Sequence, residues 1–180
     1  AGVWDDARRE ATRVAFLATG LGYAGDVWSG VVRGLDVRAA EIAAMHREAC
    51  EAHARGEQSA RLMDLRMTCL ARHVQEVRAV TDLFVAADAR IVEKAIDAVA
   101  SLRPLARCAD ADALLADLPP PDDPTLLAAV EAVRTRLAEL TALRYTRRLD
   151  ASVAAADAAV RDAEATGYGP VIGEALLERG

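Results

Sequence analysis

Apolar residues recur every three or four positions along most of this 180-residue chain, a spacing typical of amphipathic helices. Over 59–85 the apolar stripe is broad, which indicates a helix with more than one neighbour. We expect further helices at about 4–18, 26–55, 89–102 and 111–117, a helical hairpin from 124 with its turn at 144–146, and a last helix at 171–179. The sequence therefore predicts an all-α fold of antiparallel helical hairpins or a helical bundle. The stripe over 59–85 consists of Met63, Met67, Leu70, Val74, Val77, Thr81 and Phe84.

Polar caps, glycines and prolines mark where these helices begin and end. Gly56 is expected to end the helix at 26–55, since glycine suits the left-handed conformation that follows a helix. The clearest break is Leu-Pro-Pro-Pro-Asp-Asp-Pro at 118–124, because consecutive prolines cannot continue a helix. We place a semi-rigid joint at 119–123, between a helical region at 1–118 and a hairpin unit at 124–180. The candidate N-caps are Asp26, Ser59, Asp88, Asp110 and Asp123.

The helix at 171–179 is expected to lack a partner. Pro124 and Pro170 are 46 residues apart, a spacing typical of repeated helix pairs, so the array looks truncated. Such repeats bury their apolar faces only against stacked neighbours. A homodimer through this helix is therefore a candidate assembly. Its apolar residues are Val171, Ile172, Leu176 and Leu177.

Charge and hydropathy narrow the kinds of partner. The formal net charge is -6, which argues against a nucleic-acid partner and against an anionic membrane surface. No uninterrupted apolar stretch of about 18 residues occurs, so we expect no membrane insertion within these residues. A protein or peptide partner is the expectation that remains.

The familiar catalytic motifs are missing from the sequence. It contains no GxGxxG or Walker sequence, no GxSxG or HExxH, and no HRD or DFG. We therefore expect a non-catalytic region without a cofactor. The opening Ala-Gly-Val-Trp, which leads directly into a helical pattern, looks like the start of a piece cut from a longer protein.

Two cysteines and two histidines form a mirrored pattern around the turn at 55–59. His46 and Cys50 precede it, Cys69 and His73 follow it, and both pairs are symmetric about a point between residues 59 and 60. Three interpretations are open: two free thiols, a Cys50–Cys69 disulfide, or a tetrahedral zinc site made by all four residues. In the zinc interpretation His53 is a substitute ligand. Cys108 is the third cysteine and would remain unpaired, or pair outside these residues.

A basic cluster surrounds Tyr145 at the expected turn of the second hairpin. It consists of Arg144, Arg147 and Arg148. The cluster is a candidate site for an acidic peptide, and a solvated turn is the alternative.

Several segments resemble the region that follows the membrane anchor in a group of bacterial serine/threonine protein kinases. The resemblance covers about 1–120. Those kinases carry an N-terminal ATP-binding catalytic domain, often one transmembrane helix, and then a helical region that leads into tetratricopeptide repeats. The similar segments are 1–20 with Tyr-Ala at 23–24, Glu-Ala-Cys-Glu-Ala at 48–52, Gly-Glu-Gln-Ser at 56–59, Asp-Leu-Arg-Met-Thr-Cys-Leu at 64–70, 87–89 and Leu-Ala-Arg-Cys-Ala-Asp at 105–110.

The resemblance implies a sensor or scaffold region on the extracytoplasmic side of a bacterial membrane. Cysteines recur in the family more firmly than histidines, which favours a disulfide over zinc. At 124–180 it implies a degenerate tetratricopeptide-like hairpin leading into an α-solenoid. There Tyr145 and Ala154 match the repeat, whereas Leu143 and Arg148 depart from it. The alternatives are a cytoplasmic repeat scaffold with reduced thiols and a zinc-stabilised helical domain.

Overall fold

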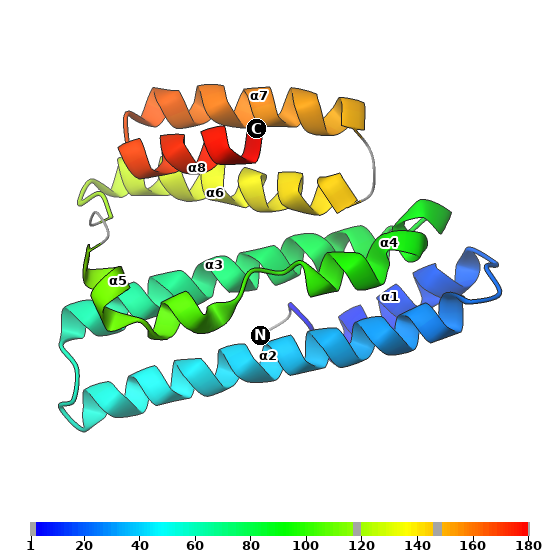
Figure 1. Ribbon diagram of the computed structural model, residues 1–180, viewed down its shortest axis with the longest axis horizontal. Coiled ribbons are helices and arrows are strands. Elements are labelled where there is room, and N and C mark those ends of the chain that lie inside the picture. The colour runs from blue at the N-terminus through cyan, green and yellow to red at the C-terminus, as the bar shows by residue number, and fades with distance from the viewer. Residues whose placement is uncertain (1–2, 117–119, 146–148, 180) are drawn as a thin grey trace. The chain divides into compact units, whose positions relative to one another are not determined.

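The computed structural model describes residues 3–116, 120–145 and 149–179, with backbone alone at 145 and 149–151. Throughout the described residues the regular structure is helical, as the apolar spacing predicts (Figure 1). The chain divides into two compact units, Ala1–Asp117 and Leu118–Gly180, called unit 1 and unit 2 below. The joint expected at 119–123 stays a prediction, since residues 117–119 lie outside the described part.

Unit 1 is a bundle built around two long helices. α2 packs against both α3 and α4, and α1 lies against α2 and α3 (Figure 1). After α4, Pro104 takes an extended conformation and leads into the short 3-10 helix η1, which returns to α3. The elements are α1 (Asp6–Ala18), α2 (Ala24–Ala54), α3 (Ala60–Val85), α4 (Ala89–Ala100), η1 (Leu105–Ala109) and α5 (Ala111–Ala116).

Aromatic residues fill the core of unit 1 where α1 meets α2 and α3. The rings of Phe16 and Phe84 meet edge to face with centroids 5.5 Å apart, and Trp28 packs on Phe16. The ring of Trp4 lies tilted against that of Trp28, with centroids 6.1 Å apart, and its indole N–H donates to Asp36 at 2.7 Å. Edge-to-face pairs of this kind stabilise a core beyond their buried area.

A second apolar cluster lies towards the α2–α3 turn. Buried Leu70, Leu105 and Cys108 form its centre. Ile42, Met45 and Cys69 pack around them. This cluster fixes η1 against both long helices.

Unit 2 consists of α6 (Pro124–Tyr145), α7 (Leu149–Thr166) and α8 (Gly169–Arg179). α8 packs against both other helices, and Val171 and Ala175 are buried in their shared core. The expectation that this helix lacks a partner is therefore wrong for the face of α8 that carries Val171 and Ala175. Its other side does remain open, since Leu177 is 83% exposed.

Most helix starts follow the expected caps. Ser59, Asp88 and Asp110 each accept a hydrogen bond from the backbone N–H three residues on. Asp123 accepts one from the N–H of Thr125. Asp26 is the exception, because α2 begins earlier, at Ala24, and Asp26 lies inside its first turn.

Among the described residues, no helix combines the length and apolar character that crossing a bilayer requires.

Candidate functional site

The α2–α3 hairpin is centred on residue 57, because α2 ends at Ala54 and α3 begins at Ala60. The ion pair between Glu48 and Arg66 is symmetric about that centre. The mirrored pattern in the sequence is centred between residues 59 and 60, so it is out of register with the hairpin. The residue of α2 that packs in the same cluster as Cys69 is Met45, not Cys50.

The expected Cys50–Cys69 disulfide is therefore wrong, and Cys69 bonds to Cys108 instead. The bond joins α3 to η1, with the two Cα atoms 5.5 Å apart and the two cysteines 39 positions apart in sequence. Cys108 is fully buried. Closing a loop of that length stabilises the fold by about 4 kcal/mol, chiefly by restricting the unfolded chain.

The four residues of the mirrored pattern fall into separate groups. Cys50 carries a free thiol, 3.8 Å from His46 Nδ1 on the exposed side of α2. His53 lies at the turn, with its Nδ1 3.3 Å from the carbonyl oxygen of Gln58. A different trio comes together instead: one ligand atom each from Cys69, His73 and Cys108 lie within 4.8 Å of one another.

His73 of that trio also belongs to a group of polar side chains with buried Glu76 and exposed Arg103. His73 Nδ1 lies 3.4 Å from Glu76 Oε2, and Arg103 pairs with the other carboxylate oxygen. Burial alone would raise the pKa of the Glu76 carboxyl, but the hydrogen bond with His73 and the charge of Arg103 outweigh it and lower that pKa. Glu76 is therefore a carboxylate at neutral pH and a fixed hydrogen-bond acceptor for the imidazole.

Arg66 connects three segments of unit 1. Its Nη1 donates to Gln58 Oε1 at 3.1 Å, its Nε donates to the carbonyl oxygen of Cys108 at 3.3 Å, and its Nη2 pairs with Glu48. Gln58 in turn donates to the carbonyl oxygen of Ala49 at the end of α2. The planar guanidinium suits this task because its donors point in several fixed directions.

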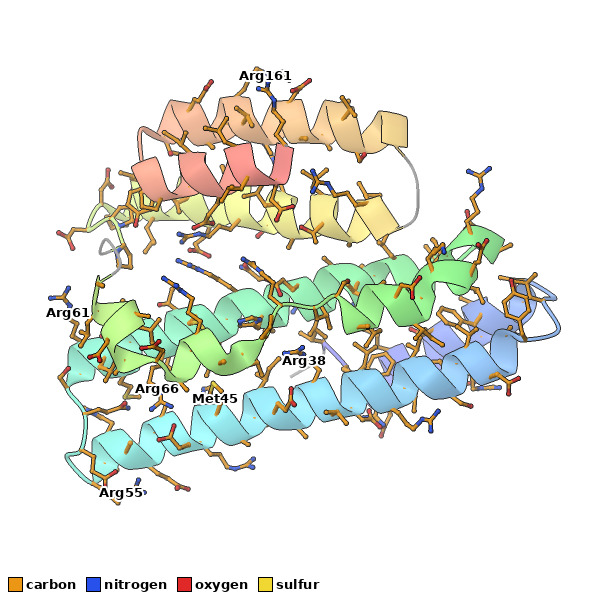
Figure 2. All side chains as sticks on the ribbon, in the orientation of Figure 1. Arg38, Met45, Arg55, Arg61, Arg66 and Arg161 are labelled. Carbon is orange, nitrogen blue, oxygen red and sulfur yellow. A yellow bond between two sulfur atoms is a disulfide. The ribbon has the colours of Figure 1, made fainter. Side chains whose placement is uncertain are left out.

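A groove of about 750 Å³ runs between α2 and the segment from α4 to η1. Figure 2 labels Arg38, Met45 and Arg66 in this part of unit 1. A smaller hollow of about 390 Å³ continues it along α2 and α4 and shares Arg38 and Glu41 with it. The large groove is lined by Arg38, Glu41, Ala44, Met45, Glu48, Arg66, Ala100, Leu102, Pro104, Leu105, Ala106 and Ala109.

The charges along the groove neutralise one another. Arg38 pairs with Glu41 and donates to the carbonyl oxygen of Leu102, and Arg66 pairs with Glu48. The lining is otherwise apolar. A groove with an apolar floor and a few oriented polar groups suits an uncharged or amphipathic chain segment.

The basic cluster of unit 2 is only partly described. Arg144 donates to the backbone carbonyl of Glu178 and lies 3.5 Å from its carboxylate. Arg147, Arg148 and the side chain of Tyr145 lie outside the described residues. The part that the structure describes thus gives Arg144 a partner within its own unit.

His73 was a candidate ligand from the sequence pattern, whereas Arg66 and Glu76 were missed because they lie beside the apolar stripe of α3. All three are buried on α3, and polar residues at helical spacing beside an apolar stripe mark partners on a neighbouring segment. No protein-family model, curated protein or solved structure matches this chain. Two features of unit 1 bear on its function, the cysteine–histidine trio and the groove whose charges are paired.

Proposed function

We propose that this chain is a non-catalytic sensor or scaffold region that binds a segment of a partner protein in the groove of unit 1. The observation that carries the proposal is the groove itself, one wall of which includes η1, held to α3 by the Cys69–Cys108 bond. A wall fixed in this way binds a chain segment at a small cost in conformational entropy.

The composition of the groove indicates the kind of segment. Ala44, Met45 and Leu105 supply an apolar floor, and the ion pairs beside them are satisfied within the protein. A highly charged ligand would find no unpaired charge there, whereas an amphipathic helix or an extended apolar segment would bury its side chains.

The parent protein that we propose is a membrane-anchored bacterial serine/threonine kinase, with this region outside the cytoplasm. The sequence resemblance supports it, and so does a buried disulfide, since such bonds persist mainly in oxidising compartments. Unit 2 would then be a degenerate tetratricopeptide-like hairpin followed by the first helix of a further repeat.

Two neighbouring alanines allow a matched test of the groove. Ala44 lines it, whereas Ala43 is also exposed on α2 but lies outside the lining. Peptides selected from a displayed library on the 180-residue chain should lose binding to Ala44→Glu by tenfold or more and keep it with Ala43→Glu. Equal binding to both variants would exclude the groove as the binding site.

The cellular assignment has its own test. The coding sequence upstream should encode a kinase domain and an apolar span of about 20 residues; the absence of either overturns the proposed parent. Thiol labelling of protein taken from its native compartment should modify Cys50 and leave Cys69 and Cys108 blocked. Labelling of all three would favour a cytoplasmic scaffold.

A further inference from the structure

We propose that Cys69, His73 and Cys108 form a zinc site when the disulfide between the two cysteines is reduced. The proposal is independent of peptide binding in the groove. It assigns two states to one partly buried cluster, a covalent bond under oxidising conditions and a metal centre under reducing ones.

The three side chains already converge. Cys69 and His73 stand one turn apart on α3, and Cys108 approaches them from η1. One ligand atom from each lies within 4.8 Å of the others. Two thiolates and one imidazole form a donor set that zinc prefers among the common biological cations, with water completing the tetrahedron.

The histidine has the supporting contact that metal-bound histidines usually have. His73 Nδ1 lies 3.4 Å from the Glu76 carboxylate, which Arg103 holds in place. A carboxylate that accepts the proton of one ring nitrogen leaves the lone pair of the other nitrogen available to a metal ion and fixes the orientation of the ring. The same contact has no counterpart at His46, whose Nδ1 faces the Cys50 sulfur.

Cys108 is anchored by contacts that do not depend on the disulfide. Arg66 donates to its backbone carbonyl oxygen at 3.3 Å, and neighbouring Leu105 is buried in the same apolar cluster. Opening the S–S bond therefore frees the sulfur while η1 stays against α3. The two sulfurs then need only side-chain rotation to accept an ion between them.

A dithiol is the reductant that opens the Cys69–Cys108 disulfide. The dithiol gives its two sulfur-bound hydrogens to Cys69 and Cys108 and becomes a disulfide itself, so two electrons pass to the protein. Zn²⁺ then displaces one proton from each thiol and gains two thiolate bonds and one imidazole bond. Two protons leave for each ion bound. In the oxidised state the sulfurs have no thiolate to offer, so the two states exclude each other.

The test uses the whole 180-residue chain with Co²⁺ as a coloured substitute for Zn²⁺. The chain is reduced, freed of reductant under nitrogen and titrated. We expect one Co²⁺ per chain with thiolate-to-cobalt charge-transfer absorption, its displacement by Zn²⁺, and release of about two protons per ion. The oxidised chain should show no such absorption. Equal absorption from the oxidised chain, or none from the reduced one, overturns the proposal.

Variants locate the ligands. Cys50→Ser should bind as the parent chain does, whereas Cys108→Ser should lose the absorption. Glu76→Gln keeps every ligand and should weaken binding by about 10–100-fold, with circular dichroism reporting that each variant is folded. Loss of binding in Cys50→Ser with retention in Cys108→Ser would move the site to Cys50 and overturn the assignment. Unchanged absorption in His73→Ala would show that the imidazole is not a ligand and would also overturn the proposal.

Discussion

Arg66 shows how one buried charge sets the geometry of the site. Its side chain is 9% exposed, and its three acceptors come from α2, the hairpin turn and η1. A buried charge is tolerated only where partners replace its hydration. The guanidinium thus orders the wall of the groove and the backbone of Cys108 together.

Replacing Arg66 by Met should lower the free energy of unfolding by about 2–3 kcal/mol, because the buried carbonyl and amide oxygens lose their donor. Glu48 is half exposed, so it regains water and adds little to the loss. Urea denaturation measures the change. Arg61→Met on the exposed side of α3 is the control, and it should stay within about 0.5 kcal/mol of the parent chain. Similar losses in both variants would contradict the anchoring role.

Glu76 should make stability depend on pH in the acid range. Its pKa is lower in the folded chain than its ordinary value, so the unfolded chain binds the proton more readily. The stabilisation is complete above the ordinary carboxyl pKa of about 4.3, and is lost as pH falls through the lower folded value. The groups that face it are His73 and Arg103.

The measurement is the unfolding free energy of the parent chain and of Glu76→Gln at several pH values. The difference between them should be largest near neutral pH and shrink as the carboxyl protonates. A difference that stays constant down to pH 3 would show that the charge of Glu76 contributes nothing.

At the scale of elements, the close approach of α2 and α4 depends on two glycines one turn apart. A Cβ at Gly34 would lie 2.6 Å from Val99 Cγ1, whereas one at Gly30 would meet the end of Ile96 at 3.1 Å. Valine is stiff about its single side-chain torsion and cannot withdraw its methyl easily. The terminal methyl of a half-exposed isoleucine can move.

Gly34→Ala should therefore be less stable than Gly30→Ala by about 1–2 kcal/mol, since both gain the same helix propensity and only one is overpacked. Thermal unfolding followed by circular dichroism compares them. Gly25→Ala, in the first turn of the same helix, is a control without overpacking, because a Cβ there meets nothing within 4 Å. If Gly34→Ala matched Gly25→Ala, the close contact with Val99 would not limit the packing of α2 on α4.

The helices were predictable because their signals are local. Ser59, Asp88 and Asp110 cap helices as expected, and the turn glycine Gly56 has a positive φ of 75°. The prediction that Asp26 caps α2 is wrong because the backbone carbonyl of Tyr23 already accepts the first hydrogen bonds of this helix. Capping chemistry tells where a helix can start, and a neighbouring turn decides between close alternatives.

The candidate site was less predictable because its contacts are not local. Which residues of a helical hairpin face each other depends on where the turn is centred. The mirrored sequence pattern places that centre a few residues too late, and Cys50 was therefore paired with Cys69. The true partner, Cys108, follows Pro104 in a segment without periodicity. Nothing in the spacing of apolar residues indicates that this segment returns to α3.

At the scale of the whole molecule, the disulfide acts within one unit alone. Cys69 and Cys108 both belong to unit 1, and so do both tryptophans of the chain, Trp4 and Trp28. Tryptophan fluorescence therefore reports the unfolding of unit 1, whereas far-ultraviolet circular dichroism reports the helices of both units. The two signals separate the contributions of the units without cutting the chain.

Reduction should lower the free energy of unfolding of unit 1 by about 4 kcal/mol, the loop-closure entropy that returns to its unfolded state. In urea, the fluorescence transition should move to lower denaturant, while the circular dichroism keeps a component at its original midpoint from α6, α7 and α8. Cys108→Ser should behave as the reduced chain does, and Cys50→Ser as the oxidised one. A single transition that shifts as a whole in both signals would mean that the two units unfold together, and that the bond stabilises the entire chain.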